Sequence, residues 1–151
     1  MMYFQKSQLN ALAAGVIKPG EIYRMKLTQE EGVKPKNTEE DGRNKYFVVL
    51  GTTDDGELIG FVLINSEINQ RLPQEIKKLQ YKINTKDYPF LKKDSYICCS
   101  ELKHIETYKF FQRFQEDAVA VLSDKHMETI KNFLAHSPRV TYASLRNLGL
   151  L

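Results

Sequence analysis

The sequence contains little cysteine, no long apolar run and no standard catalytic motif, and each absence narrows the functions to consider. No stretch of 18 consecutive apolar residues occurs, whereas a membrane-spanning helix needs about 20. Residues 1–15 lack the charged start and the long apolar stretch of a secretory signal peptide. We therefore expect a cytoplasmic protein that does not enter a membrane.

The two cysteines, Cys98 and Cys99, are adjacent in the sequence. Neighbouring residues on a strand point to opposite faces, so these thiols do not pair readily with each other. No other cysteine and no Cys-His spacing is present that would build a zinc site. The Walker, GxGxxG, GxSxG and HExxH patterns are also absent. We expect buried thiols, no metal and no cofactor.

The strand and turn patterns predict a mainly β fold. The 151 residues fit one domain of ordinary composition, 42% hydrophobic and 27% charged. Ser123 is a good N-cap for an amphipathic helix from Asp124 to about Ala135. Strand-like runs between turn signals occur at 21–27, 46–50, 57–64, 79–83, 96–99 and 118–122. This pattern favours a small antiparallel barrel with a C-terminal helix packed on it.

A turn signal at residues 18–20 marks the beginning of the domain proper. We predict an N-terminal arm over residues 1–19, the barrel over 20–136 and a C-terminal tail over 137–151. The tail contains a valine and several leucines, which would be costly to leave in water. It is therefore expected to dock on the barrel or on a partner.

A lysine-rich segment lies in the second half of the predicted sheet. Between Lys77 and Lys93 there are six lysines and one acid, Asp87, with aromatic residues among them. Lysines attract phosphates and aromatic rings stack on bases, which predicts a surface for single-stranded nucleic acid. The residues assigned to that surface are Lys77, Lys78, Tyr81, Lys82, Lys86 and Tyr88. The alternative is a solvated strand with a lysine-rich outer face.

Another polar group lies where two predicted strands should meet. A long polar segment, Thr28 to Asn44, leads to Lys45 at the start of the central strand. Lys45 and Ser66 are each about ten residues from the hairpin turn between their strands, so they are predicted to face each other. Together with Arg43 and Asn65 they could bind a phosphate and stabilise charge during its transfer. The alternative is ordinary surface polarity at a strand end.

Several segments together resemble the MazF/PemK/Kid family of toxins. The family begins with a Gly-Asp/Glu-Ile-x strand, a flexible loop and an Arg-Pro-x-Val-Val-Leu strand, followed by a Tyr-Pro-Phe element. The similarity extends over about residues 20–136 and keeps the order of the family's segments. The segments that carry it are Gly20–Tyr23, Arg43–Leu50, Tyr88–Phe90, Ser95–Ile105 and Asp117–Leu134.

The resemblance implies an SH3-like barrel that forms a homodimer. It also implies a toxin-antitoxin function, in which an endoribonuclease cuts single-stranded RNA without a metal and a small antitoxin protein occupies the RNA groove. Lys45 stands at the family's active-site arginine, Tyr46 at its proline, and Asn65 and Ser66 at its Thr/Ser pair. The implied catalytic residues are thus Arg43, Lys45 and Ser66. The alternative is a non-catalytic barrel of the same fold that binds nucleic acid or a protein partner.

Overall fold

The computed structural model describes residues 5–151 and is mainly β. The predicted arm over residues 1–19 lies partly outside the described residues, and its described part forms helix α1 (Lys6–Val16). Helix α1 packs near helix α3 (Thr107–Arg113), which the sequence patterns did not predict. None of the helices in the described residues is long and apolar enough to cross a membrane.

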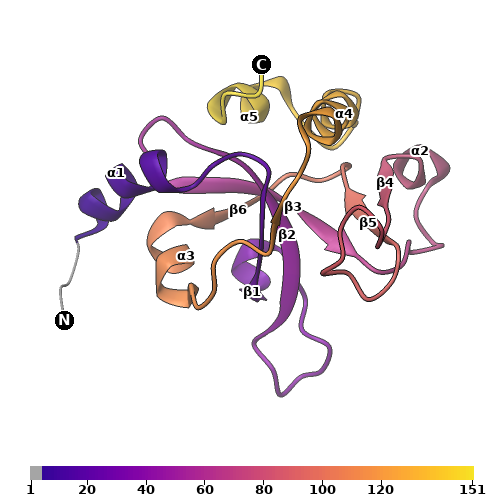
Figure 1. Ribbon diagram of the computed structural model, residues 1–151, viewed down its shortest axis with the longest axis horizontal. Helices are drawn as coiled ribbons and strands as arrows, with labels where there is room; N and C mark the ends of the chain where they lie inside the picture. Colours follow the sequence, from indigo (N-terminus) through magenta and orange to yellow (C-terminus); the bar gives the residue numbers. More distant parts are fainter. Residues whose placement is uncertain (1–4) are drawn as a thin grey trace.

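Seven strands form one curled antiparallel sheet, a half-barrel in which β2 and β3 are central (Figure 1). The order along the sheet is β4-β5-β3-β2-β1-β7, and β6 pairs with the other end of β3. The strands are β1 (Glu21–Thr28), β2 (Gly42–Thr52), β3 (Leu58–Asn65), β4 (Gln80–Ile83), β5 (Ser95–Cys98), β6 (Lys103–Glu106) and β7 (Ala120–Val121).

The two faces of the sheet carry separate apolar clusters, because successive side chains of β2 point to opposite sides. Phe47 and Val49 belong to one cluster, together with Phe110 of α3. Val48 and Leu50 belong to the other, which also contains residues of helix α4 (Asp124–Ala135). Residues 47–50 of β2 are therefore buried on both faces of the sheet.

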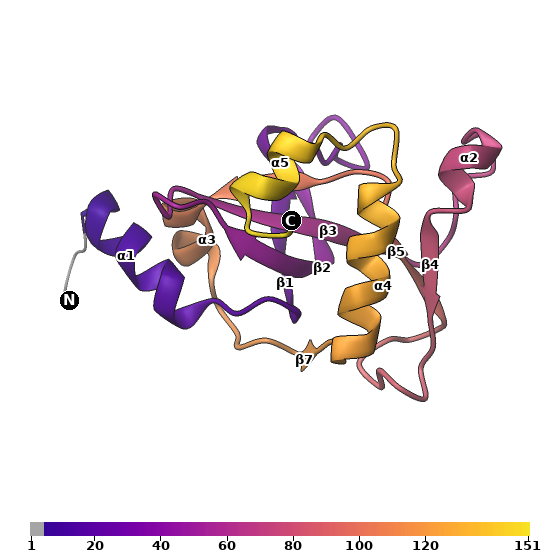
Figure 2. The ribbon, with the colours of Figure 1, turned by 90° about the horizontal axis from the view of Figure 1, so that it is seen from above.

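Helix α4 begins after Ser123, whose side chain accepts a hydrogen bond from the backbone N–H of His126. Figure 2 shows α4 and α5 (Tyr142–Asn147) along one side of the sheet, with α1 and α3 at one end of it. The short helix α2 (Gln74–Lys77) precedes β4. Neither α2 nor α5 was predicted, since each spans less than two helical turns and has too few residues for a recognisable apolar period.

The tail docks on its own sheet. Leu145 and Leu148 are 1% and 5% exposed. A Cβ atom at Gly51 of β2 would lie 2.7 Å from the Leu148 carbonyl oxygen, so the close approach of the tail requires glycine there. Of the two alternatives from the sequence, docking on the barrel or on a partner, the structure shows the first for these leucines.

Candidate nucleic-acid interface

The register of the sheet brings Lys45 and Asn65 together at one end of β2 and β3. Tyr46 pairs with Ile64, so the next step along the antiparallel ladder places Lys45 opposite Asn65. The Lys45 Nζ atom donates a hydrogen bond of 2.6 Å to Asn65 Oδ1. Ser66 follows directly at the end of β3 and is exposed.

Arg43 belongs to the same strand as Lys45 and not to the preceding loop. The long polar segment from Thr28 to Asn44 is not one continuous loop, because residues 29–31 form a 3₁₀ helix, η1 (Gln29–Glu31), and β2 already begins at Gly42. Arg43 pairs with Leu27 of β1. Because Arg43 and Lys45 are two residues apart on a strand, their side chains leave the same face.

A groove of about 430 Å³, here called the first lobe, contains all four polar residues of the predicted phosphate site. Its cations outnumber its anions: Lys34, Arg43, Lys45, Lys103 and Arg139 line it together with Glu67 and Glu101. Both acids are already paired, Glu67 with Lys93 at 3.3 Å and Glu101 with Arg139 at 2.9 Å. The first lobe therefore has unbalanced positive charge.

A neighbouring groove of about 470 Å³, here called the second lobe, shares Arg43, Lys45 and Ser66 with the first. Its remaining polar lining includes Arg24, Asn44, Lys92, Lys93, Ser95 and Glu116, and its apolar lining is Tyr46, Ile64 and Leu91. The three shared residues therefore lie where the two lobes meet. A strand of nucleic acid that passes from one lobe to the other would contact them.

The electrostatics at this junction favour an anion. Burial lowers the pKa of Lys45 below its usual value, and the charge of Arg43 lowers it further; Cys98 opposes this in part, and Lys36 adds a smaller lowering effect. The Arg43 Nε atom is buried and has no hydrogen-bond partner among residues 5–151. A phosphate oxygen could accept from this nitrogen and would offset the repulsion between the two cations.

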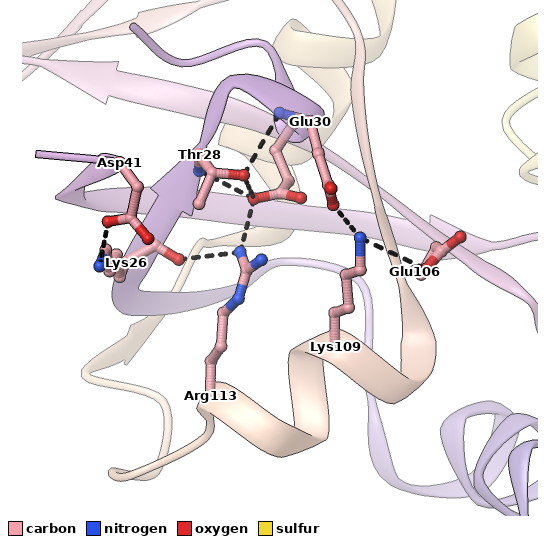
Figure 3. Close-up of polar contacts among 8 residues, drawn as sticks. Lys26, Thr28, Glu30, Asp41, Glu106, Lys109 and Arg113 are labelled. Atoms are coloured by element: carbon pink, nitrogen blue, oxygen red, sulfur yellow. Dashed lines mark hydrogen bonds and ion pairs between the residues drawn. The ribbon is translucent and has the colours of Figure 1, made fainter. Parts of the chain in front are cut away.

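The start of the loop that borders the groove is held by ion pairs to α3, which Figure 3 shows. The Glu31 carboxylate, 2% exposed, lies 2.5 Å from Nη1 of Arg113. It also accepts hydrogen bonds from the backbone N–H and the hydroxyl of Thr28, at 2.8 and 3.0 Å. Lys109 pairs with Glu30 one helical turn earlier. Beyond this anchor, Lys34 reaches the first lobe.

The sequence analysis missed this anchor, although part of its signal is local. Thr28 and Glu31 form a capping box, which has the sequence pattern Thr-x-x-Glu. The partner Arg113 is distant in the sequence, so no local pattern indicates it. Acidic residues of a polar loop are ordinarily solvated, whereas the Glu31 side chain is buried.

The structure separates most of the lysine-rich segment from the two lobes, and of its six lysines Lys92 and Lys93 line the second lobe. Tyr88 is 5% exposed, and its hydroxyl oxygen lies 2.5 Å from Nδ1 of His126, so its ring is not available to stack on a base. His126 itself is half-buried. Tyr81 is half-buried against His126 and Phe133. Of the residues assigned to nucleic-acid binding, Lys77, Lys78, Tyr81, Lys82, Lys86 and Tyr88 line neither lobe, and Asn65 lines the first.

No group of three or more metal-ligating side chains lies close together within the part of the chain that the structure describes. Cys98 and Cys99 are free thiols; Cys99 is buried and Cys98 half-buried. Burial raises the pKa of the Cys99 thiol. In comparisons with known proteins, no family model matches the chain and no curated protein matches it.

Proposed function

We propose that the protein is a cytoplasmic, MazF/PemK-like toxin with an SH3-like barrel and α4 as its C-terminal helix, and that it binds and cuts single-stranded RNA. The observation that carries the proposal is the meeting of Arg43, Lys45, Asn65 and Ser66 at the junction of two basic lobes. The resemblance in segment order supports the same assignment.

Charge supports binding of a polyanion. Eight basic and three acidic residues line the two lobes together: Arg24, Lys34, Arg43, Lys45, Lys92, Lys93, Lys103 and Arg139 against Glu67, Glu101 and Glu116. Each phosphate that such cations neutralise releases bound counterions, so the affinity for RNA should fall as salt rises. The lobes are open grooves that meet at one end of the central strands β2 and β3, and an extended strand needs such open grooves.

The same residues suit cleavage without a metal. The ribose 2′-oxygen attacks the adjacent phosphorus and loses its proton to water, which forms the O2′–P bond of a cyclic phosphate. The P–O5′ bond breaks, and the Lys45 ammonium donates a proton to the departing 5′-oxygen. Its lowered pKa makes it a better acid than an ordinary lysine. Arg43 stabilises the charge on the phosphate, and Ser66 positions a phosphate oxygen.

A second candidate function, binding without cleavage, is favoured by one observation. No histidine lines either lobe among the described residues, and the carboxylates Glu67 and Glu101 are held in ion pairs. The proton of the 2′-hydroxyl therefore has no obvious acceptor in the first lobe. In this alternative the barrel binds nucleic acid or a protein partner and leaves it intact.

The proposal includes two protein partners, a second copy of the chain in a homodimer and a small antitoxin that occupies the groove. Both rest on the family resemblance. The apolar tail no longer supports the dimer, because Leu145 and Leu148 are covered by the protein's own sheet.

Binding is tested with a labelled single-stranded RNA by fluorescence anisotropy at several salt concentrations. Wild-type affinity should fall steeply with salt. Lys45→Ala removes one phosphate contact and should reduce the slope of log K against log salt by about 0.7. Lys18→Ala is the matched control, because this exposed lysine lies outside both lobes. Affinity that does not change with salt would contradict the proposal.

Cleavage is tested with the same RNA on a denaturing gel in the presence of EDTA. Ser66→Ala removes a hydroxyl and no charge, so it should slow cleavage and leave binding nearly unchanged. Lys45→Ala should damage both. Salt-dependent binding without cleavage by the wild type would favour the second candidate function, binding without cleavage. Cleavage by both variants at the wild-type rate would exclude these residues from the chemistry.

A further inference from the structure

The second lobe has an apolar floor that phosphate binding does not need. Ile64 and Leu91 are 4% and 8% exposed, so they present small patches of an otherwise buried surface. Tyr46 packs its ring against Phe90 with centroids 4.9 Å apart. The Arg24 guanidinium lies over the Tyr46 ring, 5.7 Å from its centroid. The Tyr46 and Phe90 rings are tilted by 53° to each other, so these groups form an angled aromatic surface against which a flat aromatic ligand can pack.

The rim of this lobe differs from the floor in its charge. Lys92 and Lys93 are exposed on it, and Glu116 is its single acidic residue. No hydrogen bond or ion pair engages the Glu116 carboxylate within residues 5–151, although five basic residues line the same lobe. In contrast, Glu67 and Glu101 of the first lobe are both paired. Glu116 is thus a free pair of hydrogen-bond acceptors beside an apolar floor.

We propose that the second lobe is a nucleobase subsite that takes guanine, and that Glu116 determines this specificity. The proposal rests on the proposed function, since it names the base next to the bound phosphate. An ionised carboxylate only accepts hydrogen bonds. Guanine presents two adjacent donors, N1–H and the N2 amino group, and so matches both carboxylate oxygens.

The other bases match this carboxylate less well. Adenine and cytosine each place an acceptor nitrogen beside their amino group, and uracil has one N–H between two carbonyl oxygens. Each of them therefore directs at least one lone pair toward the carboxylate. An unpaired single strand exposes these Watson–Crick edges, as such recognition requires.

The position of the lobe links this base to the phosphate site. Arg43, Lys45 and Ser66 line both lobes. A guanosine with its base on the floor of the second lobe would therefore place a neighbouring phosphate at Lys45. Lys92 would hold a further phosphate at the rim, beside Lys93, which is paired with Glu67. The substrate inferred from this arrangement is single-stranded RNA with guanine beside the contacted phosphate.

The test uses labelled oligouridines that carry one central guanosine, adenosine or cytidine, each titrated with the full-length protein. The wild type should bind the guanosine strand about tenfold more tightly than the adenosine strand, the discrimination that a good two-bond contact gives. Glu116→Gln replaces one acceptor by a donor and should reduce this preference to about twofold or less. The exposed position of Glu116 makes loss of folding unexpected, and circular dichroism checks it.

Glu57→Gln is the matched control, because Glu57 is exposed just before β3, at the opposite end of that strand from Asn65. It should keep the wild-type preference. Salt-dependent binding without a preference for guanosine would overturn the subsite and leave the proposed function standing, as would a preference that survives Glu116→Gln. Absence of salt-dependent binding to any of the strands would overturn the proposed function and the subsite with it.

Discussion

Replacing Arg113 by methionine should show how much the ion pair between α3 and the start of the loop that borders the groove contributes to the free energy of unfolding. Arg113 Nη1 contacts the Glu31 carboxylate at 2.5 Å and the Lys26 carbonyl oxygen at 3.1 Å. Methionine keeps much of the aliphatic volume of arginine but removes the charge and both hydrogen bonds. The Glu31 carboxylate would then remain buried without its counter-ion.

The magnitude follows from the burial of the two partners. Removing one member of a buried ion pair costs about 3–5 kcal/mol of folding free energy. Glu31 keeps its two hydrogen bonds from Thr28, and the Arg113 side chain is 22% exposed, so solvent screens part of the loss. We therefore expect the lower end, about 3 kcal/mol. In a domain of this size that lowers Tm by about 6–12 °C.

The assay is chemical denaturation of the purified protein, with Lys109→Met as the matched control on the same helix. Lys109 pairs with Glu30, whose side chain is 64% exposed, so its loss should cost at most about 1 kcal/mol. The double variant Glu31→Gln/Arg113→Met should be less destabilised than the two single effects added together, because the partners interact directly. The reasoning is refuted if Arg113→Met is no more destabilising than Lys109→Met.

Two further predictions follow. Lys45 has a lowered pKa and therefore loses its charge at lower pH than exposed lysines do. As pH rises, the affinity of the wild type for 2′-O-methyl RNA should decline at lower pH than the affinity of Lys45→Arg. Identical pH profiles of the two proteins by anisotropy would contradict this. Gly51→Ala places a Cβ against the Leu148 carbonyl oxygen, so the overpacking should lower the free energy of unfolding by about 1–3 kcal/mol. It should also increase amide hydrogen exchange in α5, and unchanged exchange there would contradict the prediction.

The central sheet could be predicted because its signals are local. The run from Tyr46 to Leu50 is apolar throughout, and the Asp55-Gly56 turn fixes its partner strand. In the structure Gly56 has a φ of 71°, which glycine tolerates. The helix from Asp124 to Ala135 also has a local signal, the Ser123 cap.

The early part of β2 could not be predicted in the same way. Residues 42–45 are polar and have no strand period, and they are extended because they pair with β1. Gly42 approaches the Leu27 carbonyl oxygen so closely that a Cβ there would collide with it. Tertiary pairing thus overrides the local composition. This pairing is also what places Arg43 beside Lys45.

For the lysine-rich segment the sequence predicted too much, because a count of charges along the chain does not tell on which side of the molecule each side chain lies. Lys82 lies on an edge strand near Asp94, at 3.8 Å, whereas Lys92 and Lys93 follow a turn and reach the second lobe. Tyr88 begins the same turn, and its ring enters the core. The distinction depends on where the turn after β4 directs each side chain.

Lys45 connects the fold to the proposed function. Its ammonium group is half-buried, and its hydrogen bond to the protein goes to the neutral amide of Asn65. The charged groups that lower its pKa, Arg43 and Lys36, carry the same sign. A buried cation that only stabilised the fold would be expected to pair with a carboxylate. The uncompensated charge disfavours the unbound protein, and a phosphate at the junction of the two lobes would relieve it. A bound anion would therefore compensate the positive charge of Arg43 and Lys45, which the neutral amide of Asn65 leaves uncompensated.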